Sequence, residues 1–190
     1  GRLRGTLGAA DYQKMISGLH DIPEKVQQAL ESREAIQKAA SRHFNEKDVF
    51  FMGRGFDYPA TMESSLKLKE VSYIHSEALA AGELKHGTIA LIEKNTLVVA
   101  VSTQRELVEK LVSNIKEVKA RGAQVLAVVL EGNRQIFAEA DDVIFVPRTK
   151  EIFNTLPEIV PLQLFAYYVA KANGCAIDKP KNLAKSVTVE

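Results

Sequence analysis

Four short runs of consecutive apolar residues stand out along the chain. None shows the alternation of apolar and polar positions that marks a strand with one solvated face. Continuous apolarity over four to six residues is typical of strands buried on both faces of a parallel sheet. Gly53 stops the first run and Pro147 stops the last. The pattern predicts strands at Val49–Met52, Thr96–Val101, Val125–Leu130 and Val143–Val146.

Helix-length stretches lie between and around these runs. Asp21, Pro23 and Glu24 offer an N-cap, a proline suited to a first turn and a carboxylate near the positive helix end. They predict a helix that reaches about His43, after a polar first segment that also has a helical pattern.

Helix signals also follow the second strand and precede the end of the chain. Thr103 and Glu106 form the pattern of a capping box, and Gly122 supplies a stop. Helices are therefore predicted from Gln104 to Arg121, and from about Pro161 to just before Gly174. The alternation of strands and helices predicts an α/β fold: a three-layer αβα sandwich with a parallel sheet, flavodoxin- or Rossmann-like in type.

Ligands of such folds collect beyond the carboxyl ends of the strands. The segments that follow the four predicted strands are Gly53–Pro59, Ser102–Gln104, Glu131–Gln135 and Pro147–Lys150. The first of them contains Gly53-Arg54-Gly55 but has Tyr58 where a dinucleotide fingerprint needs a third glycine. We interpret these glycines as a tight strand-to-helix turn.

Composition narrows the class of protein. The chain has 190 residues, 46% hydrophobic and 26% charged, which is enough for one compact domain with a buried core. Its net charge of +1 gives no argument for nucleic acid or an anionic membrane as a partner. The lone Cys175 excludes an internal disulfide and a cysteine-rich zinc site.

The apolar runs and the first residues of the chain bear on its location and processing. No apolar run approaches the length of a membrane helix, and the first residues carry no secretory signal. We therefore expect a cytoplasmic setting. Because the chain begins with Gly, we interpret it as a processed or excised piece of something longer.

The segment from Glu63 to His86 carries candidate chemistry. On a helix, Glu63, Lys67, Glu70 and Ile74 are spaced four, three and four residues apart, which places them on one face. Such a row is commonplace on a solvated face, but in a cleft it provides a general base beside a cation. His86 lies in a glycine-bracketed loop, where a surface histidine and a proton-transfer group are both reasonable readings. The other histidines show no ligand spacing, and we expect no metal and no cofactor.

Two long motifs carry a resemblance to a known family. The stretch LKLKEVSYIHSEALAAGELKHG and the closing DKPKNLAKSVTVE closely resemble the isomerase half of glucosamine-6-phosphate synthase, the glutamine–fructose-6-phosphate aminotransferases (isomerizing). That half contains two sugar isomerase (SIS) domains, and this chain resembles the second. The resemblance implies an interdomain helical segment at 1–35, the SIS domain at 36–177 and a catalytic tail at 178–190.

The resemblance also implies roles for single residues. Glu70 matches the base that moves a proton between C1 and C2 of the sugar, and His86 matches the residue that opens the sugar ring in the neighbouring subunit's site. Lys185 matches the lysine that forms a Schiff base with the open-chain sugar. Substrate-binding neighbours are implied at Glu63, Lys67 and Ala184. Lys181 stands where the family usually has arginine, so a bidentate contact there is in doubt.

The implied partners are a sugar phosphate (fructose 6-phosphate or glucosamine 6-phosphate), a second copy in a homodimer, and the first SIS and glutaminase domains of a full-length protein. No phosphate-gripping Ser/Thr loop of the first SIS domain and no N-terminal Cys nucleophile is present in this sequence. We therefore expect aminotransferase/isomerase chemistry to which this chain contributes, with little or no activity of the chain alone.

Two other functions stay open. One is a non-catalytic SIS module that binds a phosphosugar and regulates another process; the other is a purely structural dimerisation piece. Fold alone does not choose among them. The lysine in the tail distinguishes among them, because a sensor needs no reactive amine. A reactive amine needs burial, which lowers a lysine pKa that is ordinarily about 10.4.

Overall fold

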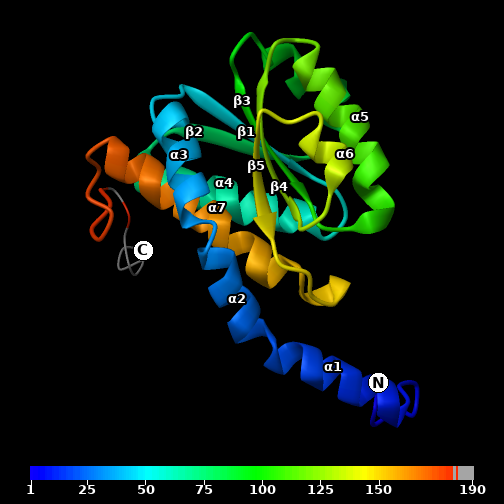
Figure 1. Ribbon diagram of the computed structural model, residues 1–190. Helices are drawn as coiled ribbons and strands as arrows, with labels where there is room; N and C mark the ends of the chain where they lie inside the picture. The colour runs from blue at the N-terminus through cyan, green and yellow to red at the C-terminus, as the bar shows by residue number, and fades with distance from the viewer. Residues whose placement is uncertain (182, 184–190) are drawn as a thin grey trace, which may run out of the picture.

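A five-stranded parallel sheet forms the centre of the molecule in a computed structural model that describes residues 1–181 and 183 (Figure 1). The strands follow the order β2-β1-β3-β4-β5, and every neighbouring pair is parallel. This is the predicted α/β architecture. The bounds are β1 Asp48–Gly53, β2 His75–Ala80, β3 Leu97–Ser102, β4 Gln124–Leu130 and β5 Asp142–Val146.

The four predicted strands are confirmed, and β2 is the strand that sequence analysis missed. It pairs with β1 from Asp48↔His75 to Gly53↔Ala80. It lies at the edge of the sheet, and its exposed His75 and Glu77 alternate with buried Ser76. An edge strand with a solvated side does not need continuous apolarity, so β2 lacks the signal that marked the others.

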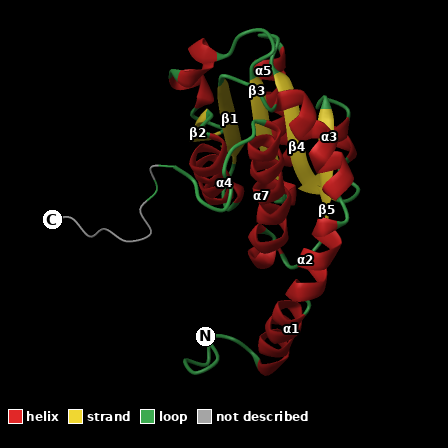
Figure 2. Cartoon of the chain, turned by 90° about the vertical axis from the view of Figure 1, so that its left-hand side faces the viewer, coloured by secondary structure: helices red, strands yellow, loops and turns green. Residues whose placement is uncertain are grey.

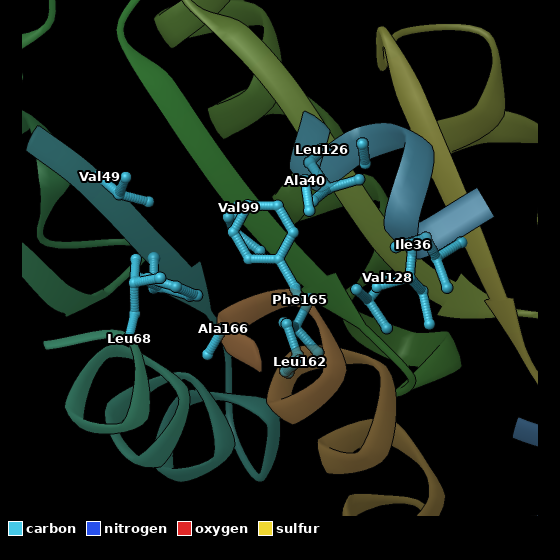
Figure 3. Close-up of a cluster of buried hydrophobic side chains, with 14 of the residues drawn as sticks. Ile36, Ala40, Val49, Leu68, Val99, Leu126, Val128, Leu162, Phe165 and Ala166 are labelled. Carbon is cyan, nitrogen blue, oxygen red and sulfur yellow. The ribbon is translucent and has the colours of Figure 1, made fainter. Parts of the chain in front are cut away.

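Helices cover both faces of the sheet. One face packs against α3 (Arg33–His43), α4 (Asp57–Ser72) and α7 (Thr155–Ala172). Figure 3 shows Leu162 and Phe165 of α7 directed at Val99 and Val128 of the sheet. The other face packs against α5 (Val108–Lys119) and the short α6 (Arg134–Phe137). The two buried clusters make the predicted three layers; in Figure 2 the strands are spread across the view behind α4 and α7.

The helix predicted from Asp21 to His43 is two helices, α2 (Ile22–Leu30) and α3. At the break, the Ser32 hydroxyl donates a hydrogen bond to the Ala29 carbonyl at 2.6 Å, a local bond that competes with continuation of the helix. Asp21 makes no side-chain cap; it joins α2 to α1 (Ala9–His20). Helix α1 has no buried residue and extends away from the sheet (Figures 1 and 2).

Helix α4 ends earlier than the predicted charged face requires. Tyr73 adopts a left-handed conformation with φ 64° and terminates the helix, so Ile74 lies beyond the helix and not on its face. Leu66, in the middle of α4, is 42% exposed, so the helix is not buried on all sides.

The predicted capping box does not form. The Thr103 hydroxyl donates to Asp57, and among the described residues it accepts no hydrogen bond from a backbone N–H of the next helix; a 3₁₀ turn at Arg105–Leu107 precedes α5. The stop at Gly122 is confirmed, with φ +87°.

Helix α7 begins at Thr155, upstream of the predicted start, and contains Pro161 in its interior. Its first turn already holds Pro157, and a proline is suited to that position. Among the described residues, no helix is both long and apolar enough to cross a membrane.

Candidate functional site

A carboxylate–ammonium–carboxylate row lies on α4, as the sequence predicts. The Lys67 Nζ is 2.6 Å from Glu70 Oε2 and 3.5 Å from Glu63 Oε1. All three side chains are partly buried, and Glu70, at 26% exposed, is the most covered. The hydrogen bond to Glu70 raises the pKa of Lys67, so its ammonium stays charged at neutral pH. We call Glu63, Lys67 and Glu70 the α4 row.

The turn between β1 and α4 fixes where this row lies. A Cβ at Gly53 would be 2.8 Å from the backbone carbon and oxygen of Asp57, so only glycine allows the helix to start this close to the strand. This supports the reading of the GRG segment as a tight turn. From Asp57, α4 runs back along the sheet, and Glu70 lies about 20 Å further along the helix axis. The α4 row is therefore near the amino ends of the strands.

The first part of the predicted tail returns to the same end of α4. The backbone N–H of Lys181 donates to the Tyr73 hydroxyl at 2.8 Å. The Lys181 ammonium lies 4.5 Å from the centroid of the Tyr73 ring, a cation–π distance. Lys181 therefore uses the aromatic face, a contact that does not need the bidentate geometry of arginine. The predicted Lys185 and Ala184 lie outside the described residues.

His86 lies at the opposite, carboxyl end of the strands. It closes a 3₁₀ turn, Leu84–His86, that follows the carboxyl end of β2. Its side chain is 63% exposed and lies 4.0 Å from the Glu83 carboxylate. Because β2 starts beside the end of α4 and runs away from it, one chain does not bring His86 to Glu70.

A cavity of about 490 Å³ opens at the carboxyl edge of β3, β4 and β5. Three of the four predicted ligand segments contribute to it, through Ser102 and Thr103, through Gly132–Gln135, and through Arg148. The fourth, Gly53–Pro59, does not line it. The cavity's arginines have no local sequence signal, because they follow three different strands, and only the fold shows that Arg105, Arg134 and Arg148 line one cavity.

A buried pair of carboxyl groups lies beneath this edge. Asp57 accepts bonds from the Thr103 backbone N–H at 2.9 Å and from the Thr103 hydroxyl at 2.5 Å. Glu158 of α7 is 0% exposed, and its carboxylate oxygens have no hydrogen-bond partner among the described residues. Burial and then the charge of Asp57 raise the pKa of Glu158 to about 8; burial also raises the pKa of Asp57. Glu158 is thus protonated at neutral pH.

Comparison with known proteins gives consistent matches. The SIS domain family matches residues 44–171. The glutamine–fructose-6-phosphate aminotransferase [isomerizing] of Caldanaerobacter subterraneus is 56% identical over 98% of this chain, and that of Clostridium tetani is 51% identical over 98%. Each match covers 31% of the relative, so the chain spans about a third of the length of these curated relatives.

A solved structure agrees in fold. The C-terminal domain of glucosamine-fructose-6-phosphate aminotransferase from Francisella tularensis superposes with a TM-score of 0.87 and 34% identity. The match covers 94% of this chain and 50% of that one. Half of the Francisella domain therefore has its counterpart in this chain.

Proposed function

The chain belongs to the SIS domain family, and from this premise we propose that it forms the second SIS domain of a glutamine–fructose-6-phosphate aminotransferase (isomerizing). In that role it supplies a base and a reactive lysine to a site that converts fructose 6-phosphate and ammonia into glucosamine 6-phosphate. The observation that carries the proposal is the α4 row, with Lys67 2.6 Å from Glu70, together with the anchoring of the tail's first residues at Tyr73.

Glu70 is the proposed base. A ketose-to-aldose conversion moves a proton from C1 to C2, and a carboxylate positioned between the two carbons can carry it. Lys67 holds the Glu70 carboxylate in place and, as a permanent cation, stabilises negative charge that develops on the sugar oxygens. Glu63 holds the other side of the Lys67 ammonium, and by resemblance Glu63, Lys67 and Ala184 contact the sugar.

Lys185 is the proposed nucleophile. Its neutral amine adds to the C2 carbonyl and water leaves, which gives an iminium; ammonia then displaces the lysine from that carbon, and the resulting imine is isomerised by Glu70 to the 2-amino sugar. Lys185 comes four positions after Lys181, so its Cα is within about 14 Å of an anchored residue. Tyr73 is in turn about 4.5 Å along the helix from Glu70. The chain length therefore allows the amine to reach the α4 row.

A second copy is proposed to supply His86. Within one chain, His86 and Glu70 lie near opposite ends of the strands, whereas ring opening and proton transfer occur on one sugar. A homodimer in which each His86 serves the other subunit's site reconciles the two positions. The chain by itself is then incomplete, and we expect no robust formation of glucosamine 6-phosphate from it.

The test is made in the complete enzyme that contains this domain. Substitution Glu70→Gln should lower turnover by about 10²–10⁴-fold and abolish exchange of the C1 proton, while trapping of fructose 6-phosphate by borohydride at Lys185 persists. Glu34→Gln, on the exposed face of α3, is the matched control and should leave turnover, proton exchange and trapping unchanged. Unaltered turnover in Glu70→Gln would leave only a structural role, and absence of any trapped adduct in the unsubstituted enzyme would favour a phosphosugar-binding regulatory module.

A further inference from the structure

The middle residue of the Gly53-Arg54-Gly55 turn has contacts that a tight turn alone does not explain. Its side chain reaches from the turn to α5 and to residues 81–86, which we call the His86 segment. We propose that Arg54 is a positioning residue, which holds this segment at the angle at which His86 meets the sugar ring. The inference rests on the proposed function, because it takes from it that His86 opens the ring in the neighbouring subunit's site.

A buried amide on α5 fixes the guanidinium of Arg54. The Nε and Nη2 atoms of Arg54 both donate to Asn114 Oδ1, at 3.1 and 2.8 Å, and Asn114 is buried. The Asn114 amide nitrogen donates in turn to Glu117 Oε2 at 3.2 Å, which agrees with an oxygen, and not a nitrogen, facing the arginine. Two bonds from a planar fork to one oxygen hold the guanidinium in one orientation.

The same guanidinium lies beside the start of the His86 segment. A Cβ at Gly82 would be 3.4 Å from both Nη1 and Nη2 of Arg54, so the guanidinium fills the space in front of this glycine. Local backbone bonds follow directly along the chain. The Glu83 N–H donates to the Ala80 carbonyl at 2.8 Å, and the His86 N–H donates to the Glu83 carbonyl at 3.0 Å. A displacement of Gly82 is therefore carried to His86.

The remaining contacts of the segment leave the direction of His86 open. Leu84 is buried in the apolar cluster beneath α5 and fixes the turn at one point. The imidazole of His86 lies 4.0 Å from the Glu83 carboxylate, and an ion pair between two exposed groups restrains them little. A turn fixed at Leu84 can still pivot, and the contact of Arg54 with Gly82 supplies a second point.

The backbone of Arg54 is held independently of its side chain. Its carbonyl oxygen accepts from the Asp57 N–H at 3.0 Å and from Gln104 Nε2 at 2.6 Å. Gly55 makes room for the second donor, because a Cβ there would be 2.6 Å from Gln104 Oε1. Arg54 is thus fixed at both ends, and its side chain connects the turn and α5 to the His86 segment.

Packing alone does not account for an arginine at this position. Among the ion pairs formed by residues 1–181 and 183, none involves Arg54, which is half-buried. A half-buried cation without a counter-ion is costlier than an apolar side chain of similar length. The position uses the directed fork of the guanidinium, which a lysine ammonium does not provide.

The experiment separates ring opening from the later steps in the complete enzyme. Fructose 6-phosphate must be opened before it reacts, whereas 5-deoxyfructose 6-phosphate lacks the hydroxyl group that closes the ring and is always open. Arg54→Gln should lower turnover of fructose 6-phosphate by about 10–10²-fold, since a misplacement of about 1 Å has a cost of this order. The same variant should convert the open-chain analogue at the rate of the parent enzyme.

Two further variants test the route by which Arg54 acts. Asn114→Ala removes the acceptor that orients the guanidinium and should reproduce the pattern of Arg54→Gln. Arg33→Gln removes the same charge from exposed α3 and should change neither rate. Equal losses with both substrates would mean that Arg54 supports the site as a whole, and unchanged turnover of fructose 6-phosphate would mean that it does not position His86. Either result overturns the inference.

The His86→Ala variant distinguishes this inference from the proposed function. It should lose turnover of fructose 6-phosphate and keep that of the analogue, whereas Glu70→Gln should lose both, because proton transfer follows ring opening. If His86→Ala behaves so and Arg54→Gln does not, the positioning inference alone is overturned. If His86→Ala loses both substrates or neither, ring opening is not its role, and the proposed role of His86 is overturned together with the inference.

Discussion

The Tyr73 hydroxyl accepts a hydrogen bond from the backbone N–H of Lys181 across 108 positions of sequence. Tyr73 is also the left-handed residue that ends α4, a conformation that is costly for an aromatic residue. The same residue therefore terminates the helix that carries Glu70 and holds the start of the tail that carries Lys185.

Substitution Tyr73→Phe should uncouple these two elements. The variant keeps the ring and its cation–π contact but loses the acceptor of the 2.8 Å bond, so we expect stability to change by less than about 1.5 kcal/mol. In the complete enzyme, turnover should fall several-fold, because the tail loses an anchor near the α4 row. Tyr12→Phe in exposed α1 is the control. Equal turnover of Tyr73→Phe and the parent would show that this bond does not position the tail.

Substitution Gly53→Ala tests the turn that aims α4. The added methyl group would meet the Asp57 backbone at 2.8 Å, and backbone cannot rotate away, so we expect a loss of about 1–3 kcal/mol in the free energy of unfolding. Gly87→Ala is the matched control, because nothing lies within 4 Å of a Cβ at Gly87. Urea denaturation of the two variants gives the comparison, and similar midpoints would mean that the turn relaxes freely.

Much of the sheet is predictable from the sequence, for a physical reason. Strands such as Val125–Leu130 are buried on both faces, so every position must be apolar and the signal is local. Strand β2 does not follow this rule because it is an edge strand, and its polar His75 and Glu77 are exposed. Helix ends were also missed where one residue decides, as at Ser32, whose hydroxyl bonds to Ala29.

The functional residues also differ in how far the sequence predicts them. The α4 row was predictable because Glu63, Lys67 and Glu70 are close in sequence and helical spacing alone brings them together. The pair of Asp57 and Glu158 is far apart in sequence and depends on how α7 packs on α4. Its signal is therefore a property of the tertiary fold.

Substitution Glu158→Gln should flatten the pH dependence of stability. The pKa of Glu158 is raised from 4.5 to about 8 in the folded chain, so the folded state binds more protons than the unfolded state between these values. Stability therefore falls as pH rises from about 5 to 8. A glutamine stays neutral and removes this component of the slope.

The measurement for Glu158→Gln is denaturant unfolding at several pH values across that range. Glu34→Gln, at an exposed position, should keep the slope of the parent chain. If the parent and Glu158→Gln lost stability in parallel as pH rose, Glu158 would not be the group that titrates.

Mixed dimers of the complete enzyme decide whether His86 acts across the subunit interface. Glu70→Gln and His86→Ala should each be nearly inactive as homodimers. In a mixed dimer, the Glu70 of the His86→Ala subunit and the His86 of the Glu70→Gln subunit form one intact site if the histidine serves its neighbour. Random mixing in equal amounts should then recover about one quarter of the parent activity, since half of the dimers are mixed and each has one working site. If His86 served its own subunit, every site would lack one of the two groups and mixing would recover nothing. Because Glu70 and His86 lie near opposite ends of the strands within one chain, recovery is the outcome that we expect.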